Sequence, residues 1–381
     1  MSANASTPTV TWPDGPLLVL SGALLAIGLV VISSASVGYA EATHANMWYH
    51  SQRHVAYLLI AACAGLFAYA MPTAFWYRSA WVWLLLSSLL LILVLVPGVG
   101  HNVNGSQRWL AFGTLTLQPS ELAKAAMILF LAGYITRQGK ALQESWQGFF
   151  RPLLVLGLVS VLLLAEPDFG AAVILLATAF GMLFLAGMRL AHLALIVTAT
   201  GLLGVFLIQA APYRLQRLIA YTDPWADPYG AGFQLVQSLI AFGRGEWLGV
   251  GLGNSVQKLF YLPEAHTDFV FSIWAEETGF IGALVLILLF LALVLRIFFL
   301  GRRALERRDS FAAYLCFGVA LMFSGQAFVN MGVSSGLLPT KGLTLPLVSY
   351  GGTSLITCCA LLGLVLRVAT DSRAPQRRRG S

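Results

Sequence analysis

Long apolar segments recur throughout this sequence, and they constrain its fold more than any other feature. Ten of them are long and apolar enough to be candidate membrane spans, and only 151–165 is clearly short of the about 20 residues that a transmembrane helix takes. Within the hydrocarbon the backbone must satisfy its own hydrogen bonds, so such segments fold as helices. We therefore predict an all-α polytopic membrane protein with ten transmembrane helices. The segments are 16–37, 54–70, 79–97, 119–136, 151–165, 169–187, 190–210, 268–296, 311–331 and 343–367.

The composition agrees with a membrane protein. Hydrophobic residues make up 58% of the chain and charged residues 10%, against about 45–50% and 25% in soluble domains. Residues 1–12 carry no Lys or Arg and the first apolar segment is long enough to span, so we expect no cleavable signal peptide. All four cysteines fall inside apolar segments, so we expect no structural disulfide and no metal site built on sulfur. They are Cys63, Cys316, Cys358 and Cys359.

The basic residues predict the orientation. An even number of spans puts both termini on one side, and most Lys and Arg residues flank that side, notably in 302–308 and 373–379. The positive-inside rule makes this side cytoplasmic. The chain then consists of a cytoplasmic tail (1–15), a membrane domain (16–368) and a basic cytoplasmic tail (369–381). The large extracytoplasmic loop, 211–267, joins helices seven and eight, and its amphipathic stretch 232–243 predicts a short helix.

Ionisable residues gather where this long loop enters the eighth apolar segment. Glu264, His266 and Asp268 stand at the junction, and Glu276 and Glu277 lie deeper. Such groups are costly in lipid and usually face a cavity, so they are candidates for function. The alternative is that Glu264 and His266 are solvated loop residues and that Asp268 caps a helix. Several acids in one element favour function.

A second cluster of ionisable residues lies at the outer ends of segments four and six. Helix N-termini point outward there, and their free N–H groups and partial positive charge suit anions such as phosphate. Lys124 lies one turn inside its span and needs a partner, for which Glu121, Asp168 and Glu166 are candidates. An ion pair that only holds helices together is the alternative. Ser120 and Asp168 also read as ordinary helix caps.

Four stretches carry a resemblance that extends over most of the chain. They are NGSQRWLAFGTLTLQPSELAK (104–124), AEPDFGAA (165–172), the run from YRLQRLIAYTDPW to WAEETGFIG (213–282), and LLPTKGLTLPLVSYGGTSL (337–355). In these stretches the sequence resembles the SEDS family (shape, elongation, division and sporulation), and its cell-division branch more than its elongation branch. Ala275 and Thr353 depart from the family pattern, at positions to which we assign no role.

The resemblance implies an activity, a location and partners. It implies a peptidoglycan glycosyltransferase of the bacterial inner membrane that polymerises lipid II, a disaccharide-pentapeptide on undecaprenyl diphosphate, at the division septum. It implies a class B penicillin-binding protein as transpeptidase partner, other membrane proteins of the division machinery, and no nucleic acid. Asp268 matches the essential aspartate of the family. Lys124 and Asp168 match a family lysine and aspartate that are held to pair near the same cavity.

Transfer from a glycosyl diphosphate needs one base at the acceptor and positive charge at the leaving group. The hypothesis is that Asp268 deprotonates the 4-hydroxyl of the acceptor sugar, with inversion at the donor anomeric carbon. Arg108 and Lys124 would hold the diphosphate, with Lys341 or a divalent cation (Mg or Mn) as further candidates, although no cofactor is firmly implied. Glu264 would shape the acceptor side or bind that cation together with Asp268. The remaining substrate-binding candidates are Glu121, Asp168, His266 and Thr267.

Two other classes of function stay open. A lipid II flippase would also use a bundle with buried charges. The sequence has no recognisable inverted repeat, however, and its polar residues gather on one face, which favours chemistry there over alternating access. A non-catalytic scaffold for division proteins is the second alternative, and it would leave the charges at Glu121, Lys124 and Asp268 unexplained.

Overall fold

A computed structural model describes residues 13–103, 106–113, 115–209, 212–339 and 342–372. The predicted N-terminal tail up to residue 12, the basic tail from residue 373 and Lys341 lie outside the described residues. Every predicted apolar segment overlaps a long helix. These helices are α1 (Gly15–Ala35), α3 (Tyr49–Ala70), α4 (Thr73–Leu95), α5 (Pro119–Glu144), α6 (Trp146–Ala165), α7 (Phe169–Leu185), α8 (Leu190–Gln209), α11 (Val270–Glu306), α12 (Ser310–Ser334) and α13 (Gly352–Asp371).

The length and composition of these helices make the chain a multi-pass membrane protein. Among the described residues, eight helices are long and apolar enough to cross a membrane. The α7 helix is apolar but shorter, with 17 residues, and α5 is not among the eight. The full count of ten spans therefore stays a prediction.

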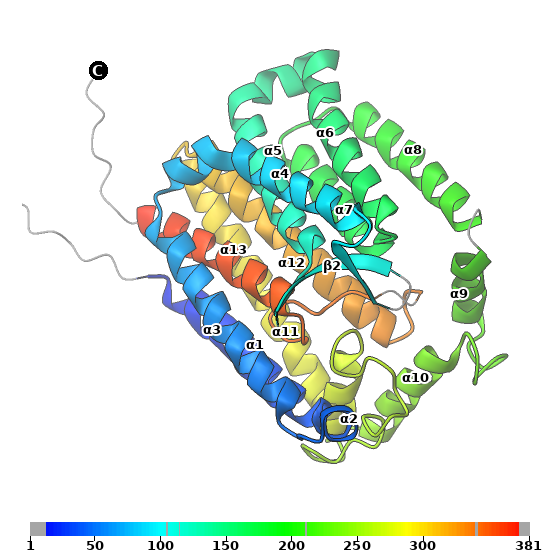
Figure 1. Cartoon of the computed structure of the whole chain (residues 1–381). Coiled ribbons are helices and arrows are strands. Elements are labelled where there is room, and N and C mark those ends of the chain that lie inside the picture. The colour runs from blue at the N-terminus through cyan, green and yellow to red at the C-terminus, as the bar shows by residue number, and fades with distance from the viewer. Residues whose placement is uncertain (1–12, 104–105, 114, 210–211, 340–341, 373–381) are drawn as a thin grey trace, which may run out of the picture.

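The bundle is built around α12 and α13. The α12 helix packs against α5, α7 and α11, while α13 lies along α3 (Figure 1). In the most apolar window of α13, 72% of the residues are buried, against 6% for α8. The α8 helix stands at the edge of the bundle, in contact with α7 and α9 (Pro212–Thr222). Because α8 presents its apolar side chains outward, lipid is their natural solvent.

A small antiparallel sheet in the loop between α4 and α5 adds strands that were not predicted to a fold that is otherwise helical, as expected. Its strands are β1 (Gly100–Val103), β2 (Ser106–Phe112) and β3 (Leu115–Leu117), paired in the order β1-β2-β3. Leu110 pairs with Gly100 on one side and with Leu117 on the other. Gly113, with φ +62°, makes the tight turn between β2 and β3, a conformation in which glycine carries no Cβ penalty.

The loops predicted to be extracytoplasmic contact one another and form one surface, here called the outer face. It contains the sheet, α2 (Val37–His44), α9 and α10 (Phe233–Gly245) (Figure 1). The predicted amphipathic helix is confirmed as α10, which packs on α11, where the rings of Phe242 and Phe271 lie 5.5 Å apart between centroids. The outer face therefore has its own helical layer above the bundle.

Two predicted helix boundaries at the outer face are wrong. Segment 343–351 forms turns, and α13 begins only at Gly352. Pro346 has no N–H to donate, and Leu347 adopts a positive φ of 65°, so a helix does not form there. Similarly, α11 begins at Val270 with Phe269 as its N-cap, so Asp268 precedes the helix and does not cap it. The stretch 343–351 is apolar enough to pass for helix in the sequence.

Candidate functional site

Asp268 lies in a tight turn on the outer face, directly before α11. The carbonyl oxygen of Glu264 accepts hydrogen bonds from the backbone N–H groups of Thr267, Asp268 and Phe269. Phe269 is buried while Asp268 is half-buried. The Asp268 carboxylate lies against Gly342, where an added Cβ atom would stand 2.7 Å from Oδ2. The turn thus holds a carboxylate at the outer face with bare backbone beside it.

The other predicted residues of this turn surround Asp268 in different ways. Thr267 donates a hydrogen bond of 2.8 Å to the exposed Glu264 carboxylate. The ring of His266 lies 5.2 Å from that of His50 and 5.7 Å from that of Tyr350, measured between centroids. Burial lowers the pKa of His266 below 6.5, against the opposing charge of Glu264. His266 is therefore a packed, neutral ring, and Glu264 is the more accessible group.

Asp168 ties together the outer ends of α5 and α7. Its Oδ1 accepts the N–H of Ala171 at 3.1 Å and caps α7. Its Oδ2 accepts from the Ser120 hydroxyl at 3.0 Å and from the Gln118 amide at 3.2 Å. The reading of Asp168 as a cap is thus confirmed. Gln118 was not foreseen, because a glutamine just before a span gives no sequence signal of its own.

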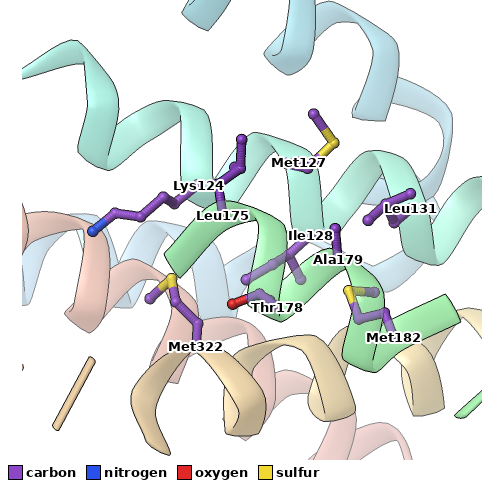
Figure 2. Close-up of a pocket in the computed structure, with 9 residues that line it drawn as sticks. All are labelled: Lys124, Met127, Ile128, Leu131, Leu175, Thr178, Ala179, Met182 and Met322. Atoms are coloured by element: carbon purple, nitrogen blue, oxygen red, sulfur yellow. The ribbon is translucent and has the colours of Figure 1, made fainter. Parts of the chain in front are cut away.

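Lys124 is fully buried and pairs with Glu121. Its Nζ lies 2.9 Å from Oε1 of Glu121, one turn earlier on α5. Among the described residues no ion pair joins Lys124 to Asp168, so the pairing implied by the resemblance is corrected. Lys124 lines one end of a narrow crevice between α5, α7 and α12, and its ammonium group points away from lining residues such as Met127 and Met182 (Figure 2). The low polarity around the pair strengthens its attraction and raises the cost of breaking it.

Arg108, on β2, clamps the turn between α6 and α7. Its Nε donates to the carbonyl of Glu166 at 3.1 Å, and its Nη2 donates to the carbonyl of Pro167 at 2.6 Å. The Glu166 carboxylate is buried without a hydrogen-bond partner in the described part of the chain. Burial raises its pKa to about 8, the nearby Asp168 adds to this, and Arg108 opposes it. Arg108 therefore supports the backbone here, which the sequence did not indicate.

One loop lies between the Asp268 turn and the Asp168 cluster and contacts both. Gly342 lies against Asp268, while the side chain of the next residue, Leu343, comes within 3.1 Å of where a Cβ on Gly170 would lie. Gly170 is in the first turn of α7, which Asp168 caps. The Gly342–Leu343 stretch is thus in contact with the Asp268 turn on one side and the N-terminus of α7 on the other.

The α11 helix is broken close to this site. Gly279 has φ +68° and ψ −167° inside the helix, and the outer loop enters the gap. The N–H groups of Val250 and Gly251 donate to the carbonyls of Glu276 and Glu277. On the other side of the gap, Phe280 donates to the carbonyl of Glu246. A side chain at Gly279 would collide with the loop backbone, since its Cβ would lie 2.4 Å from the nitrogen of Gly249.

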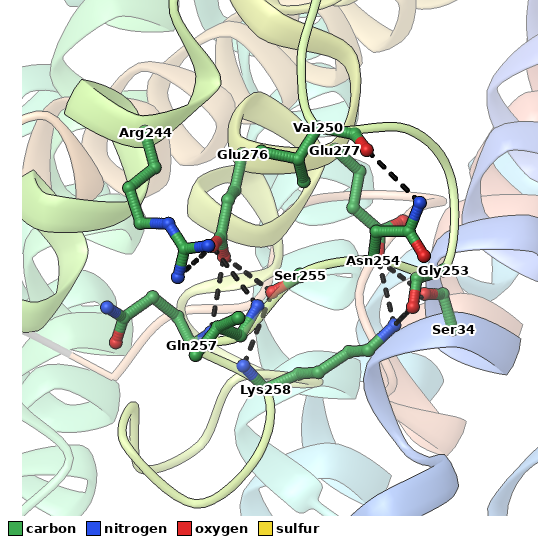
Figure 3. Close-up of polar contacts among 11 residues, drawn as sticks. Ser34, Arg244, Val250, Gly253, Asn254, Ser255, Gln257, Lys258, Glu276 and Glu277 are labelled. Atoms are coloured by element: carbon green, nitrogen blue, oxygen red, sulfur yellow. Dashed lines mark hydrogen bonds and ion pairs between the residues drawn. The ribbon is translucent and has the colours of Figure 1, made fainter.

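Glu276 and Glu277 fix the same loop through their side chains (Figure 3). The Glu276 carboxylate accepts hydrogen bonds from the Ser255 hydroxyl and the backbone of residues 256 and 257, and pairs with Arg244 at 3.5 Å. Glu277 pairs with Lys258 at 3.0 Å and accepts from Ser34 on α1 at 2.6 Å. The two deeper acids therefore hold the outer loop on α11, a structural role.

Comparison with known proteins places the chain in a family. The sequence profile of the cell cycle protein family FtsW/RodA/SpoVE matches residues 16–374. The chain belongs to the FtsW/RodA/SpoVE family.

Relatives of this family member are similar over almost its full length. It is 51% identical to the probable peptidoglycan glycosyltransferase FtsW of Pseudomonas fluorescens, over 94% of this chain and 88% of the relative. It is 52% identical to the protein of the same description from Thioalkalivibrio sulfidiphilus, over 92% of this chain and 88% of the relative. The similarity to the SEDS family and to its cell-division branch is thus confirmed.

Two solved structures have the same fold. A chain from a peptidoglycan synthase complex that coordinates polymerization and crosslinking superposes with a TM-score of 0.77 at 34% identity, over 95% of this chain and 99% of that chain. The rod shape determining protein RodA of Thermus thermophilus gives 0.69 at 30% identity, over 97% and 100%. The predicted membrane fold is therefore confirmed.

Within this family member, the predicted site residues fall into three sets. Asp268, Glu264, His266 and Thr267 share one turn, Arg108 and Asp168 support the outer ends of α5–α7, and Glu121 pairs with Lys124 below them. Among the described residues no group of three His, Cys, Asp or Glu side chains is arranged to hold a metal ion. A cation between Glu264 and Asp268 stays a prediction.

Proposed function

We propose that the chain polymerises lipid II into glycan strands and that Asp268 is the general base. The observation that carries this is the placement of Asp268: a half-buried carboxylate, held in a hydrogen-bonded turn at the outer face, with the bare backbone of Gly342 beside it. The family and the activity for which its relatives are named, peptidoglycan glycosyltransferase, support the reaction.

In this reaction the acceptor sugar's 4-hydroxyl attacks the anomeric carbon of the donor. The bond from that carbon to the diphosphate oxygen breaks, and undecaprenyl diphosphate leaves with the electron pair. Asp268 takes the hydroxyl proton as the new glycosidic bond forms, and attack from the opposite side inverts the configuration. Because diphosphate is already a good leaving group, one carboxylate suffices where a glycosidase uses two.

The diphosphate needs positive charge on the outer face. The N-termini of α5 and α7 lie at the outer face, and helix N-termini carry partial positive charge. Lys341 directly precedes Gly342 in the sequence, and Gly342 lies beside Asp268, which makes Lys341 the foremost lysine candidate. Arg108 and Lys124 contribute from positions committed to the α6–α7 turn and to Glu121. A divalent cation held by Glu264 and Asp268 would supply the same charge, with Glu121, Asp168, His266 and Thr267 shaping the surroundings.

The setting proposed for this activity is the bacterial inner membrane at the division septum, with both termini cytoplasmic. The proposed partner is a class B penicillin-binding protein, which would crosslink the strands as they form. The similarity to a chain of a synthase complex that coordinates polymerization and crosslinking supports this. Such a pairing places the growing strand and the crosslinking enzyme on the same side of the membrane.

The test uses the purified full chain in lipid vesicles, alone and with its class B penicillin-binding protein. Wild type is expected to form glycan strands, and folded Asp268→Ala to form none. Strands from Asp268→Ala would keep the enzyme but remove Asp268 as its base, with Glu264 the next residue to replace. Lipid II translocation without strand formation would instead indicate a flippase. Neither activity, with folding verified, would favour the scaffold.

A further inference from the structure

Asn330 on α12 contacts the Asp268 turn from within the bundle. Its side-chain nitrogen Nδ2 donates to the backbone carbonyl of Asp268 at 2.8 Å and to that of Leu343 at 2.6 Å. The residue is 1% exposed, so these bonds do not compete with water. Both acceptors are carbonyl oxygens, which fixes the amide with its nitrogen toward them.

The two bonds join the two segments that border the Asp268 carboxylate. One acceptor belongs to Asp268 itself, and the other belongs to the residue after Gly342, whose backbone faces Oδ2. A single NH₂ group thus uses both of its hydrogens to fix the distance between the base and the loop beside it. Neither segment is regular secondary structure at this point, so no helix or sheet ladder fixes that distance instead.

Buried hydroxyl groups hold the Asn330 end of α12 in place. The Ser238 hydroxyl on α10 donates to the carbonyl of Ser334 at 2.6 Å and lies 2.6 Å from the Ser272 hydroxyl on α11. All three serines are fully buried. Ser334 also donates to the carbonyl of Asn330 within α12. The three helices that meet behind Asp268 are therefore tied to one another by hydrogen bonds one turn from Asn330.

We infer that Asn330 is a positioning residue that sets the Asp268 carboxylate against the Gly342–Leu343 loop for catalysis. The inference rests on the proposed function, since it assigns Asn330 a part in the reaction only through Asp268. A shift of about 1 Å at a reacting group costs on the order of 100-fold in rate, and a two-donor clamp is the kind of contact that prevents such a shift.

The experiment measures lipid II polymerisation by the full chain with its class B penicillin-binding protein. Asn330→Ala removes both donors, and kcat is expected to fall by about 10- to 100-fold while KM for lipid II stays within about twofold, because the residue touches no substrate. Ser324→Ala is the matched control. It removes one hydrogen bond within the same helix, from the Ser324 hydroxyl to the carbonyl of Leu321 at 3.0 Å, leaves both Asn330 bonds intact, and should keep wild-type kcat.

A second variant tests whether Asn330 affects the pH dependence of kcat, which a purely structural residue would leave unchanged. Asn330→Asp has the same shape but places a carboxyl group beside Asp268, near Glu264 and His266 of the same turn. Negative charge there raises the pKa of the base Asp268. Because the base acts only when deprotonated, the acidic limb of kcat against pH is expected to move to higher pH. Faster amide hydrogen exchange across 264–270 in Asn330→Ala gives an independent measure of the loosened turn.

The outcomes separate this inference from the proposed function. Wild type that forms no strands, or active Asp268→Ala, would overturn the function or its base. Strands that require Asp268, with wild-type kcat in Asn330→Ala and an unmoved pH profile in Asn330→Asp, would overturn the inference alone. Equal losses in Asn330→Ala and Ser324→Ala would also overturn it, since the effect would then be general to α12.

Discussion

The carboxylate of Asp268 lies beside Gly342, so close that a single methyl group on Gly342 would stand 2.7 Å from Oδ2. Gly342→Ala therefore has to displace either the carboxylate or the loop. We expect polymerisation to fall by about 10-fold or more, because small displacements of a reacting group are costly. Measurement of kcat with purified protein checks this.

The control for that substitution is Gly243→Ala on α10, also at the outer face. A Cβ there would meet nothing within 4 Å, and alanine is favoured over glycine in a helix by about 1 kcal/mol. Its activity should match wild type, with equal or higher stability. Full activity in Gly342→Ala would contradict the contact with Asp268.

The partner of Lys124 is open to a double-mutant test. We expect Lys124→Ala and Glu121→Ala to be strongly non-additive in unfolding free energy, by roughly 0.5–3 kcal/mol, because they remove two halves of one buried pair. Lys124→Ala and Asp168→Ala should be closer to additive, since Asp168 bonds instead to Ser120, Gln118 and Ala171. The larger coupling appearing between Lys124 and Asp168 would restore the pairing that the resemblance implied.

Lys258 and Glu277 give a prediction for stability. Lys258→Met leaves the buried Glu277 carboxylate without its cation, which costs about 3–5 kcal/mol for a buried pair. The double variant Lys258→Met, Glu277→Gln removes both charges and should recover part of this loss. Denaturation of the purified protein in detergent measures both values. A double variant less stable than the single one would indicate that the pair is not the main contact.

Glu166 predicts a pH dependence of stability. Its pKa in the folded protein is raised to about 8 by burial, so the folded state binds this proton more tightly than the unfolded chain does. The stabilisation is complete below the unfolded pKa and is lost as pH rises through about 8. The unfolding midpoint of wild type should therefore fall between about pH 5 and about pH 9, and fall less in Glu166→Gln, which stays neutral. Parallel curves for the two proteins would contradict this.

The helices could be predicted because the apolar segments are long. The family could be predicted because its motifs occur in four stretches spread over most of the chain. The sheet at 100–117 was missed, since its strands are shorter than the apolar runs around it. The start of α13 was placed nine residues early, because Leu343, Leu345 and Leu347 are buried in turns and are as apolar as a span. An apolar sequence indicates that a segment is buried, but it does not show whether the backbone of that segment is helical.

The sequence indicated which residues belong to the candidate site, but it did not indicate which side chains they contact. Asp268 stood out because it adjoins an apolar run, and it lies at the outer face as expected. Three acidic residues near Lys124 were possible partners in the sequence, and only the side-chain geometry of the structure shows that Lys124 pairs with Glu121. Asn330 gave no sequence signal, because a lone amide in a span is ordinary; its significance comes from the two carbonyls it reaches.

The break at Gly279 divides α11 into two lengths with different attachments. The outer length, Val270–Thr278, is bonded to the loop at 246–258 through both backbone and side chains. The inner length is bonded to the same loop through the backbone N–H groups of Phe280 and Ile281. Residues 244–281 therefore form one interlocked block that carries Asp268 at its surface. Chimaeras between family members should exchange this block whole, with a junction after Ile281, since a junction at Gly279 or inside the loop would separate donors from their acceptors.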